Sequence, residues 1–222
     1  MNLSNTQLYI LKYILNNMNL SFNTSSNIQK KIFYIIPGLG ESSTLQNYKD
    51  LALKLKKLNF EVKIVNIKWN NYSLNDYIND FESQFIHSEK DLIYILGFSI
   101  GAIILILSKI TMHQNLKKIY LCSPSPIFKE DSKHYSIIMK LLLFFYIPKK
   151  MKRELKSLSF KNVNLSCETT IFYGSKERKE LIKGIDKFKD KFKLLKIIYI
   201  EEIGHEFSNE KYQKAVLMKI SK

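Results

Sequence analysis

Short apolar runs alternate with longer amphipathic stretches from residue 31 to the end of the chain. Runs of five or six mostly apolar residues between polar or glycine-containing segments are typical of buried strands. The sequence predicts six of them, at residues 31–36, 62–67, 92–96, 118–122, 169–173 and 196–200. Strands this short and this apolar are those of a sheet that is covered on both faces.

The stretches between the strands have apolar residues at spacings of three and four, which predict helices. Such a pattern covers residues 45–58, 73–85, 100–112, a lysine-rich stretch before the sixth strand, and the end of the chain from about Asn209. Ser73 and Asp76 have the spacing of a helix N-terminal capping pair. Strands that alternate with helices predict a three-layer α/β/α sandwich with a mostly parallel, doubly wound sheet.

Two segments fall outside this alternation. Residues 1–30 form an N-terminal extension in which Leu8, Leu11, Leu15 and Met18 predict an amphipathic helix that packs on the domain. Residues 123–166 are too long for one crossover helix and contain an apolar run, 137–147, followed by a basic run, 149–153. We interpret this segment as a helical cap, or lid, insertion. A core helix followed by a solvated basic turn, and a membrane-contacting helix, are the alternatives.

Length and composition predict a single folded domain over residues 1–222, because 222 residues suffice for one substantial core. A hydrophobic content of 45% excludes a disordered chain. Cys122 and Cys167 form no disulfide framework and have no metal-ligand spacing, so we expect a reducing compartment and no metal. No apolar run is long enough to cross a bilayer, and no secretory signal is recognisable, which predicts a cytoplasmic protein. An organellar address is left open.

The chain is strongly basic, with 35 Lys and Arg against 20 Asp and Glu and a net charge of +15. Nearly all of the positive charge is lysine, and Arg153 and Arg178 are the only arginines. Proteins that read nucleic acids rely on arginine for bidentate contacts, so we expect no nucleic-acid partner. A weak contact with anionic membrane surfaces is compatible with this charge.

The most informative motif is Gly97-Phe98-Ser99-Ile100-Gly101, which lies between the third predicted strand and an apolar helix. A serine at such a junction sits on a sharp strand-to-helix turn, where the residues two before and two after it have no room for side chains. The chain has seven glycines, and two of them are at these positions. The motif therefore predicts a nucleophile elbow with Ser99 as the nucleophile.

A serine hydroxyl needs an imidazole to take its proton and a carboxylate to orient that imidazole. Of the four histidines, only His205 follows a predicted strand by a short loop, and we expect it to be the base. Glu177 is the first carboxylate after the fifth strand and is the predicted acid, with Glu180 and Asp186 as alternatives. The order Ser99, Glu177, His205 is that of the nucleophile-elbow enzymes.

The reaction also needs two backbone N–H groups to bind the oxyanion. One is expected from Ile100, the residue after the nucleophile, and the other from Leu39, in the loop after the first strand. Gly38 and Gly40 flank Leu39 and allow the backbone to approach a substrate. A dinucleotide site is excluded there, because the third glycine and the acidic residue that follows it are missing.

These motifs resemble those of the α/β-hydrolase family, over residues from about 31 to 220. The resemblance is carried by residues 36–40, 97–101, 173–177 and 204–205. The family commonly has His-Gly where this chain has Pro37-Gly38, and aspartate where it has Glu177. In such a protein the segment 123–166 would be the variable lid. The resemblance implies hydrolysis of an ester, thioester or amide without a metal or organic cofactor.

We therefore expect a serine hydrolase that cleaves a small-molecule ester or thioester of an apolar acyl group. A catalytically silent protein that uses the same pocket to bind a ligand is the alternative from another class. Transfer of the acyl group to an alcohol or amine in place of water is a second alternative.

Overall fold

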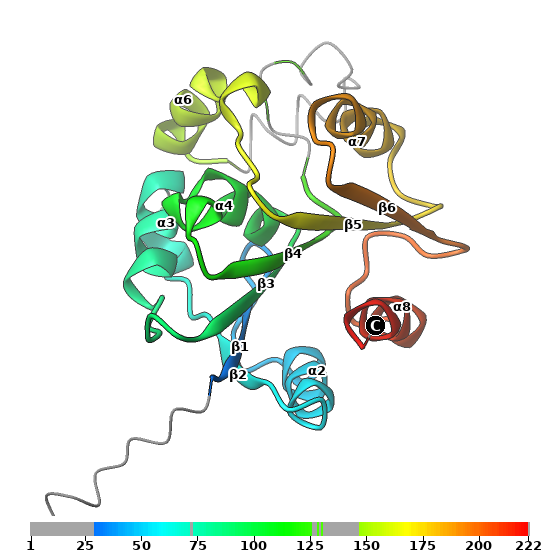
Figure 1. The fold of residues 1–222 in the computed structure, drawn as a ribbon. Coiled ribbons are helices and arrows are strands. Elements are labelled where there is room, and N and C mark those ends of the chain that lie inside the picture. The colour runs from blue at the N-terminus through cyan, green and yellow to red at the C-terminus, as the bar shows by residue number, and fades with distance from the viewer. Residues whose placement is uncertain (1–28, 72, 126–127, 129, 131–146, 222) are drawn as a thin grey trace, which may run out of the picture.

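The computed structural model describes residues 29–71, 73–125, 128, 130 and 147–221. Its centre is a sheet in which every paired strand is parallel to its neighbour, in the order β2-β1-β3-β4-β5-β6 (Figure 1). The strands are β1 (Lys31–Ile36), β2 (Glu61–Ile64), β3 (Leu92–Phe98), β4 (Leu116–Cys122), β5 (Glu168–Gly174) and β6 (Leu195–Ile200). In the pairing of β3 with β4, Ile93 lies opposite Leu116 and Phe98 lies opposite Cys122. The register shifts between Ile93 and Tyr94.

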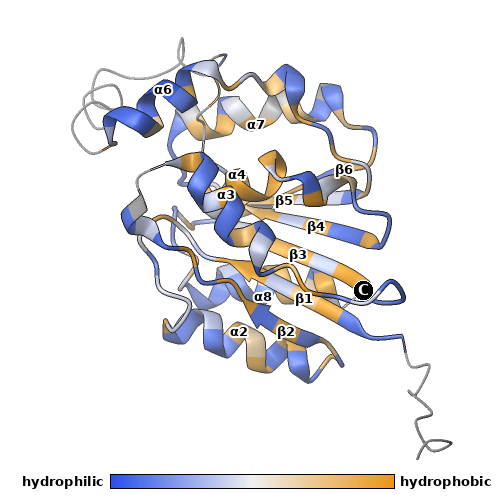
Figure 2. Ribbon diagram, turned by 90° about the vertical axis from the view of Figure 1, so that its left-hand side faces the viewer, coloured by the Kyte–Doolittle hydropathy of each residue, from blue (hydrophilic) through white to orange (hydrophobic). Residues whose placement is uncertain are grey.

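Helices cover both faces of the sheet, as Figures 1 and 2 show. One face packs against α2 (Gln46–Lys56) and α8 (Glu210–Ile220). The other packs against α3 (Leu74–Ser83), α4 (Ile100–Leu107), α6 (Lys149–Ser157) and α7 (Lys179–Lys191). Three short 3-10 helices complete the described elements: η1 (Trp69–Asn71), η2 (Lys109–Met112) and η4 (Phe160–Asn162). The predicted three-layer α/β/α architecture is confirmed.

Two separate apolar cores result, one on each face of the sheet. Successive side chains of a strand point to opposite faces. In β1, Phe33 and Ile35 therefore pack with α2 and α8, while Tyr34 and Ile36 pack with α3 and α4. Both sets are fully buried, which explains why β1 is apolar at consecutive positions.

Two predicted elements end several residues before their patterns do. The strand predicted at 62–67 is β2, which ends at Ile64, because beyond it β1 supplies only one further bond, from Val65 N–H to the Ile35 carbonyl at 2.8 Å. The helix predicted at 100–112 ends at Leu107. Ser108 has an extended backbone (φ −75°, ψ 153°), and its hydroxyl bonds the Leu105 carbonyl at 2.8 Å. The chain continues as the 3-10 helix η2.

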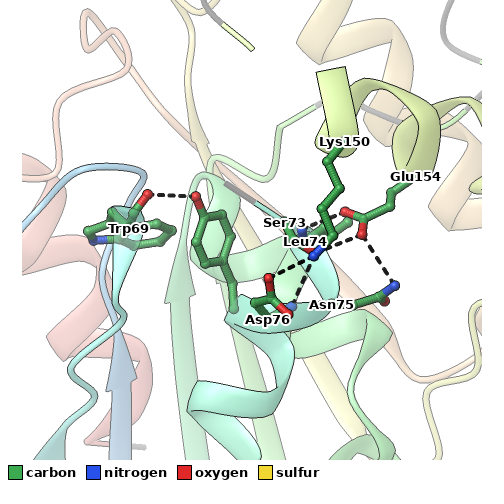
Figure 3. Close-up of polar contacts among 8 residues, drawn as sticks. Trp69, Ser73, Leu74, Asn75, Asp76, Lys150 and Glu154 are labelled. Atoms are coloured by element: carbon green, nitrogen blue, oxygen red, sulfur yellow. Dashed lines mark hydrogen bonds and ion pairs between the residues drawn. The ribbon is translucent and has the colours of Figure 1, made fainter. Parts of the chain in front are cut away.

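The alternative that places residues 149–153 in a solvated turn is wrong, because these residues form the first turns of helix α6. Its Met151 is buried, while Glu154 accepts hydrogen bonds from the Ser73 hydroxyl at 2.7 Å and from Leu74 N–H at 2.6 Å. Figure 3 shows these contacts at the start of α3, beside the ion pair of Lys150 with Asp76 at 3.0 Å. The helix N-terminus favours a carboxylate, so Glu154 ties α6 to α3.

Half of the capping prediction at α3 is confirmed, since the Ser73 hydroxyl accepts from Asp76 N–H at 3.4 Å, while the Asp76 carboxylate pairs with Lys150. Asn209 caps α8 in the same way, through Lys211 N–H. The predicted helix within residues 1–30 and the apolar run 137–147 lie outside the described residues. Within the described part of the chain, no helix has the length and apolar character needed to cross a bilayer.

The strand order reverses between β2 and β3, which lie on opposite sides of β1. In parallel sheets, ligands bind beyond the carboxyl ends of the strands at such a switch point. The chain segments that leave β1 and β3 at this edge are Pro37-Gly38-Leu39-Gly40 and the turn at Ser99. The topology therefore brings the two predicted halves of the site to one edge of the sheet.

Candidate active site

Ser99 is the single residue between β3 and α4, and its backbone is in a conformation that side chains rarely adopt. Its φ is +54° and its ψ −116°. Its N–H donates to the Cys122 carbonyl at the end of β4, at 2.9 Å. This bond holds the turn against the sheet, so the strain at Ser99 is sustained by the neighbouring strand.

The glycines on either side of Ser99 are required by close backbone contacts. A Cβ atom at Gly97 would lie 2.6 Å from the Gly101 carbonyl oxygen, as the motif predicts. A Cβ at Gly101 would lie 2.4 Å from the Pro37 oxygen and 2.5 Å from the Ile36 oxygen. Gly101 is therefore needed because α4 passes directly against the end of β1, a contact that the motif alone does not reveal.

This packing predicts that Gly101→Ala lowers the free energy of unfolding by about 3 kcal/mol. The value is near the upper end of the usual cost of overpacking, because the atoms that the new Cβ would meet belong to the backbone of β1 and the residue after it. Chemical denaturation of the variant and the native protein measures the difference. Gly204→Ala is the matched control, since the nearest atom to its Cβ would be 4.0 Å away, and its effect should be within about 0.5 kcal/mol. Equal stability of the two variants would contradict the packing argument.

Ser99, His205 and Glu177 lie in one hydrogen-bonded chain. The Ser99 hydroxyl is 2.9 Å from His205 Nε2, and His205 Nδ1 is 3.0 Å from Glu177 Oε2. An ionised carboxylate only accepts, so Nδ1 carries the proton and leaves Nε2 to accept from the serine. The imidazole is placed to take the hydroxyl proton while the carboxylate sets its tautomer.

The two groups differ in their contact with solvent. The His205 side chain is 41% exposed, whereas that of Glu177 is 1% exposed. The ring of His205 packs on Phe98, with the centroids 5.0 Å apart. The base is therefore open to a substrate, while the carboxylate behind it is shielded from water.

The glutamate is held by a buried polar network that sequence reasoning missed. The Ser123 hydroxyl donates to Glu177 Oε1 at 2.5 Å and lies 2.9 Å from the Tyr212 hydroxyl. Tyr212 donates to the Phe172 carbonyl at 2.9 Å, and burial raises its pKa well above the ordinary value. Both carboxylate oxygens of Glu177 thus have partners. Ser123 directly follows β4, so its place at the carboxyl edge was the available signal.

The two alternative acids are placed differently. Glu180 and Asp186 are both within α7, and their side chains lie outside what the structure describes. Glu177 precedes this helix, in the turn that leaves β5, where its N–H donates to the Gly174 carbonyl at 3.1 Å. Glu177 is the candidate that the structure brings to His205.

The two predicted oxyanion donors lie at the start of α4 and in the loop after β1. Ile100 is the first residue of α4, so its N–H has no acceptor within the helix. Leu39 is 49% exposed and lies in the loop after β1. That loop is close to the elbow, because a Cβ at Gly38 would lie 2.9 Å from the Phe98 ring.

A second hydroxyl lies beside the candidate nucleophile. Ser125 Oγ is 3.1 Å from Ser99 Oγ. When Ser99 donates its proton to His205, Ser125 is the donor in this pair. The motif search did not indicate Ser125, which lies three residues after β4.

The remaining described histidines and Cys122 are not part of this hydrogen-bonded chain. His87 and His113 precede β3 and β4, with their rings 4.4 Å apart, at the opposite edge of the sheet from Ser99. His134 is outside the described residues. Cys122 is buried, and burial raises the pKa of its thiol. Within the residues that the structure describes, no cluster of three His, Cys, Asp or Glu side chains forms a metal site.

No family model matches the sequence, and no curated protein is similar to it at the sequence level. Solved structures are similar in fold. Est1E from Butyrivibrio proteoclasticus has a TM-score of 0.68 and 12% identity, over 89% of this chain and 88% of that one. Mouse alpha/beta hydrolase domain-containing protein 10 has a TM-score of 0.69 and 10% identity, over 85% and 87%. For dienelactone hydrolase from Anabaena variabilis ATCC 29413 the values are 0.61 and 10%, over 87% and 84%.

Proposed function

The chain has the α/β-hydrolase fold, and we propose that it is a serine hydrolase acting on a small-molecule ester or thioester of an apolar acyl group. The observation that carries the proposal is the chain of two hydrogen bonds from Ser99 through His205 to Glu177. It joins residues that are 106 and 28 positions apart in the sequence. The strained elbow at Ser99 supports the same function, as do the positions of the Ile100 N–H at the start of α4 and of the Leu39 N–H in the loop after β1.

The first half of the reaction forms an acyl-enzyme. Ser99 Oγ attacks the acyl carbon as its proton passes to His205 Nε2, and Glu177 stabilises the imidazolium through Nδ1. The carbonyl oxygen becomes negative in the tetrahedral intermediate and binds the N–H groups of Leu39 and Ile100. His205 then donates its proton to the leaving alcohol or thiol, and the bond to it breaks.

The second half releases the acid. Water takes the place of the leaving group, His205 accepts one of its protons, and the resulting hydroxide attacks the acyl carbon. Collapse of the second intermediate returns the proton to Ser99 Oγ and frees the carboxylic acid. The 41% exposure of His205 is compatible with the entry of water and substrate from the same side.

Hydrolysis of p-nitrophenyl esters with acyl chains of increasing length tests the proposal, because the leaving group reports each turnover. We expect hydrolysis together with a covalent adduct on Ser99 after treatment with a fluorophosphonate, located by mass spectrometry. The absence of both product and adduct would contradict the proposal and support the alternative of a ligand-binding protein. Addition of a primary alcohol to the assay measures how the acyl group divides between water and another acceptor.

A further inference from the structure

The loop after β1 is closed by Glu41, a residue that the proposed reaction steps do not use. Glu41 Oε2 accepts a hydrogen bond from Gly38 N–H at 2.8 Å, and Glu41 N–H donates to the Gly38 carbonyl at 3.0 Å. Both the side chain and the backbone of Glu41 therefore bind Gly38, which lies at the other end of the turn. The Tyr48 hydroxyl joins them, donating to the same carboxylate oxygen and lying 3.2 Å from Gly38 N–H.

The residue enclosed by these bonds is Leu39, the expected oxyanion donor. The bond from Glu41 N–H to the Gly38 carbonyl makes Leu39 and Gly40 the two central residues of a four-residue turn. Gly40 has a φ of +75°, which is the value of the third position of a type II turn. None of the hydrogen bonds of this turn uses the Leu39 N–H.

Glu41 is itself fixed from two sides. Its carbonyl accepts from Trp69 Nε1 at 2.8 Å, and Trp69, labelled in Figure 3, packs edge-on against Tyr77 with the centroids 4.9 Å apart. On the other side, Tyr48 is fully buried and stacks on Phe207, two residues after His205, at 5.4 Å. The turn is thus connected to α3 and to the loop that carries the histidine.

The donors and acceptors of this cluster leave little freedom. Burial and the neighbouring Glu41 carboxylate raise the pKa of the Tyr48 hydroxyl, which keeps it a donor. Gly38 is buried, and leaving a buried N–H without an acceptor costs free energy. This cost favours the arrangement in which Gly38 N–H is hydrogen-bonded. Without the carboxylate, Gly38 N–H would have only the Tyr48 oxygen as a partner.

We propose that Glu41 is a positioning residue for the oxyanion site, holding the turn in which the Leu39 N–H is presented to the substrate. The inference rests on the proposed function, because only a reaction that passes through an oxyanion uses that N–H. An oxyanion donor acts in the transition state and much less in the bound substrate, so its displacement lowers kcat and leaves KM nearly unchanged.

The test compares Glu41→Ala with Glu41→Gln in p-nitrophenyl ester hydrolysis. An amide oxygen can accept both hydrogen bonds, whereas alanine accepts neither. We expect kcat of Glu41→Ala to fall by about tenfold or more with KM within about twofold, and Glu41→Gln to keep most of the native kcat. Glu201→Ala, at an exposed glutamate after β6, is the matched control and should behave as the native protein.

A second measurement reports on the loop without any activity. Trp69 is the only tryptophan of the chain and is bonded to Glu41, so quenching of its fluorescence by acrylamide follows the turn. We expect stronger quenching in Glu41→Ala and native quenching in Glu41→Gln. If Glu41→Ala does not fold, Tyr48→Phe, which removes one hydroxyl and keeps the ring, should change both readouts in the same direction.

The outcomes separate this inference from the proposed function. Ester hydrolysis that depends on Ser99 and keeps its native kcat in Glu41→Ala, or in Tyr48→Phe where only that variant folds, would overturn the positioning role alone. Equal losses of kcat in Glu41→Ala and Glu41→Gln would also overturn it, since the acceptor geometry would then not matter. If the native protein hydrolyses no ester and Trp69 quenching still responds to Glu41→Ala, the proposed function fails and the anchoring of the turn stands.

Discussion

Replacing Ser99 with alanine should lower the turnover of p-nitrophenyl esters by a factor on the order of 10⁶. The hydroxyl oxygen is the atom that would bond to the acyl carbon, and alanine has no nucleophilic atom to replace it. Its 2.9 Å contact with His205 Nε2 would be lost as well. The measurement is the initial rate of p-nitrophenolate release, compared with the rate in buffer alone.

The fold of this variant should be unchanged, which makes the comparison clean. Alanine at residue 99 keeps the Cβ atom and the N–H that binds the Cys122 carbonyl. Thermal unfolding should therefore differ little from that of the native protein. A second hydroxyl, that of Ser125, lies 3.1 Å from Ser99 Oγ, so the double variant Ser99→Ala with Ser125→Ala belongs in the same assay. Native turnover in Ser99→Ala would refute the assignment of the nucleophile.

Glu177→Gln should lower turnover at neutral pH by about 10⁴, although the side chain keeps its size. An amide can turn its NH₂ group toward His205, which would then hold its proton on Nε2 and could not accept one from Ser99. The Ser123 hydroxyl, 2.5 Å from the other carboxylate oxygen, would still have an acceptor in the amide oxygen. The variant thus changes the tautomer of the base more than the packing around it.

The measurement for Glu177 is kcat/KM for one ester in the native protein and in Glu177→Gln, with Glu202→Gln as the control. Glu202 is an exposed glutamate in the neighbouring loop after β6. Native activity in Glu177→Gln would mean that Glu180 or Asp186 is the acid, or that no carboxylate is needed. Activity lost equally in both variants would exclude a specific role for Glu177.

Much of the fold was predictable from periodicity. The five- and six-residue apolar runs correspond to strands β1, β3, β4, β5 and β6. A parallel strand covered on both faces is apolar at consecutive positions, as in the buried strands β1 and β5, whereas β6 lies at the end of the sheet and is only partly buried. The ends of elements were less predictable. Helix α4 ends at Leu107 because the backbone of Ser108 is extended, and an apolar pattern that continues through residue 110 does not indicate this change.

The residues of the candidate site also differ in how they could be predicted. Ser99 could be found from local signals, since a strained turn between strand and helix needs glycines at fixed spacings. His205 and Glu177 were selected by chain order and by their place after strands, and the structure brings all three together. Their catalytic roles are what the Ser99 and Glu177 variants test.

The sequence by itself determined the alternation of strands and helices and the position of the sharp turn, because both depend on residues that are close in the chain. Only the tertiary structure decided which hydroxyls and carboxylates surround that turn. Ser123, Tyr212 and Glu41 reach the site from three different parts of the chain. Ser123 is marked only by its place after β4, and no local pattern distinguishes Tyr212 or Glu41 from other polar residues. A hydrogen bond across 54 or 89 residues depends on strand order and register, which are set by the packing of the whole sheet.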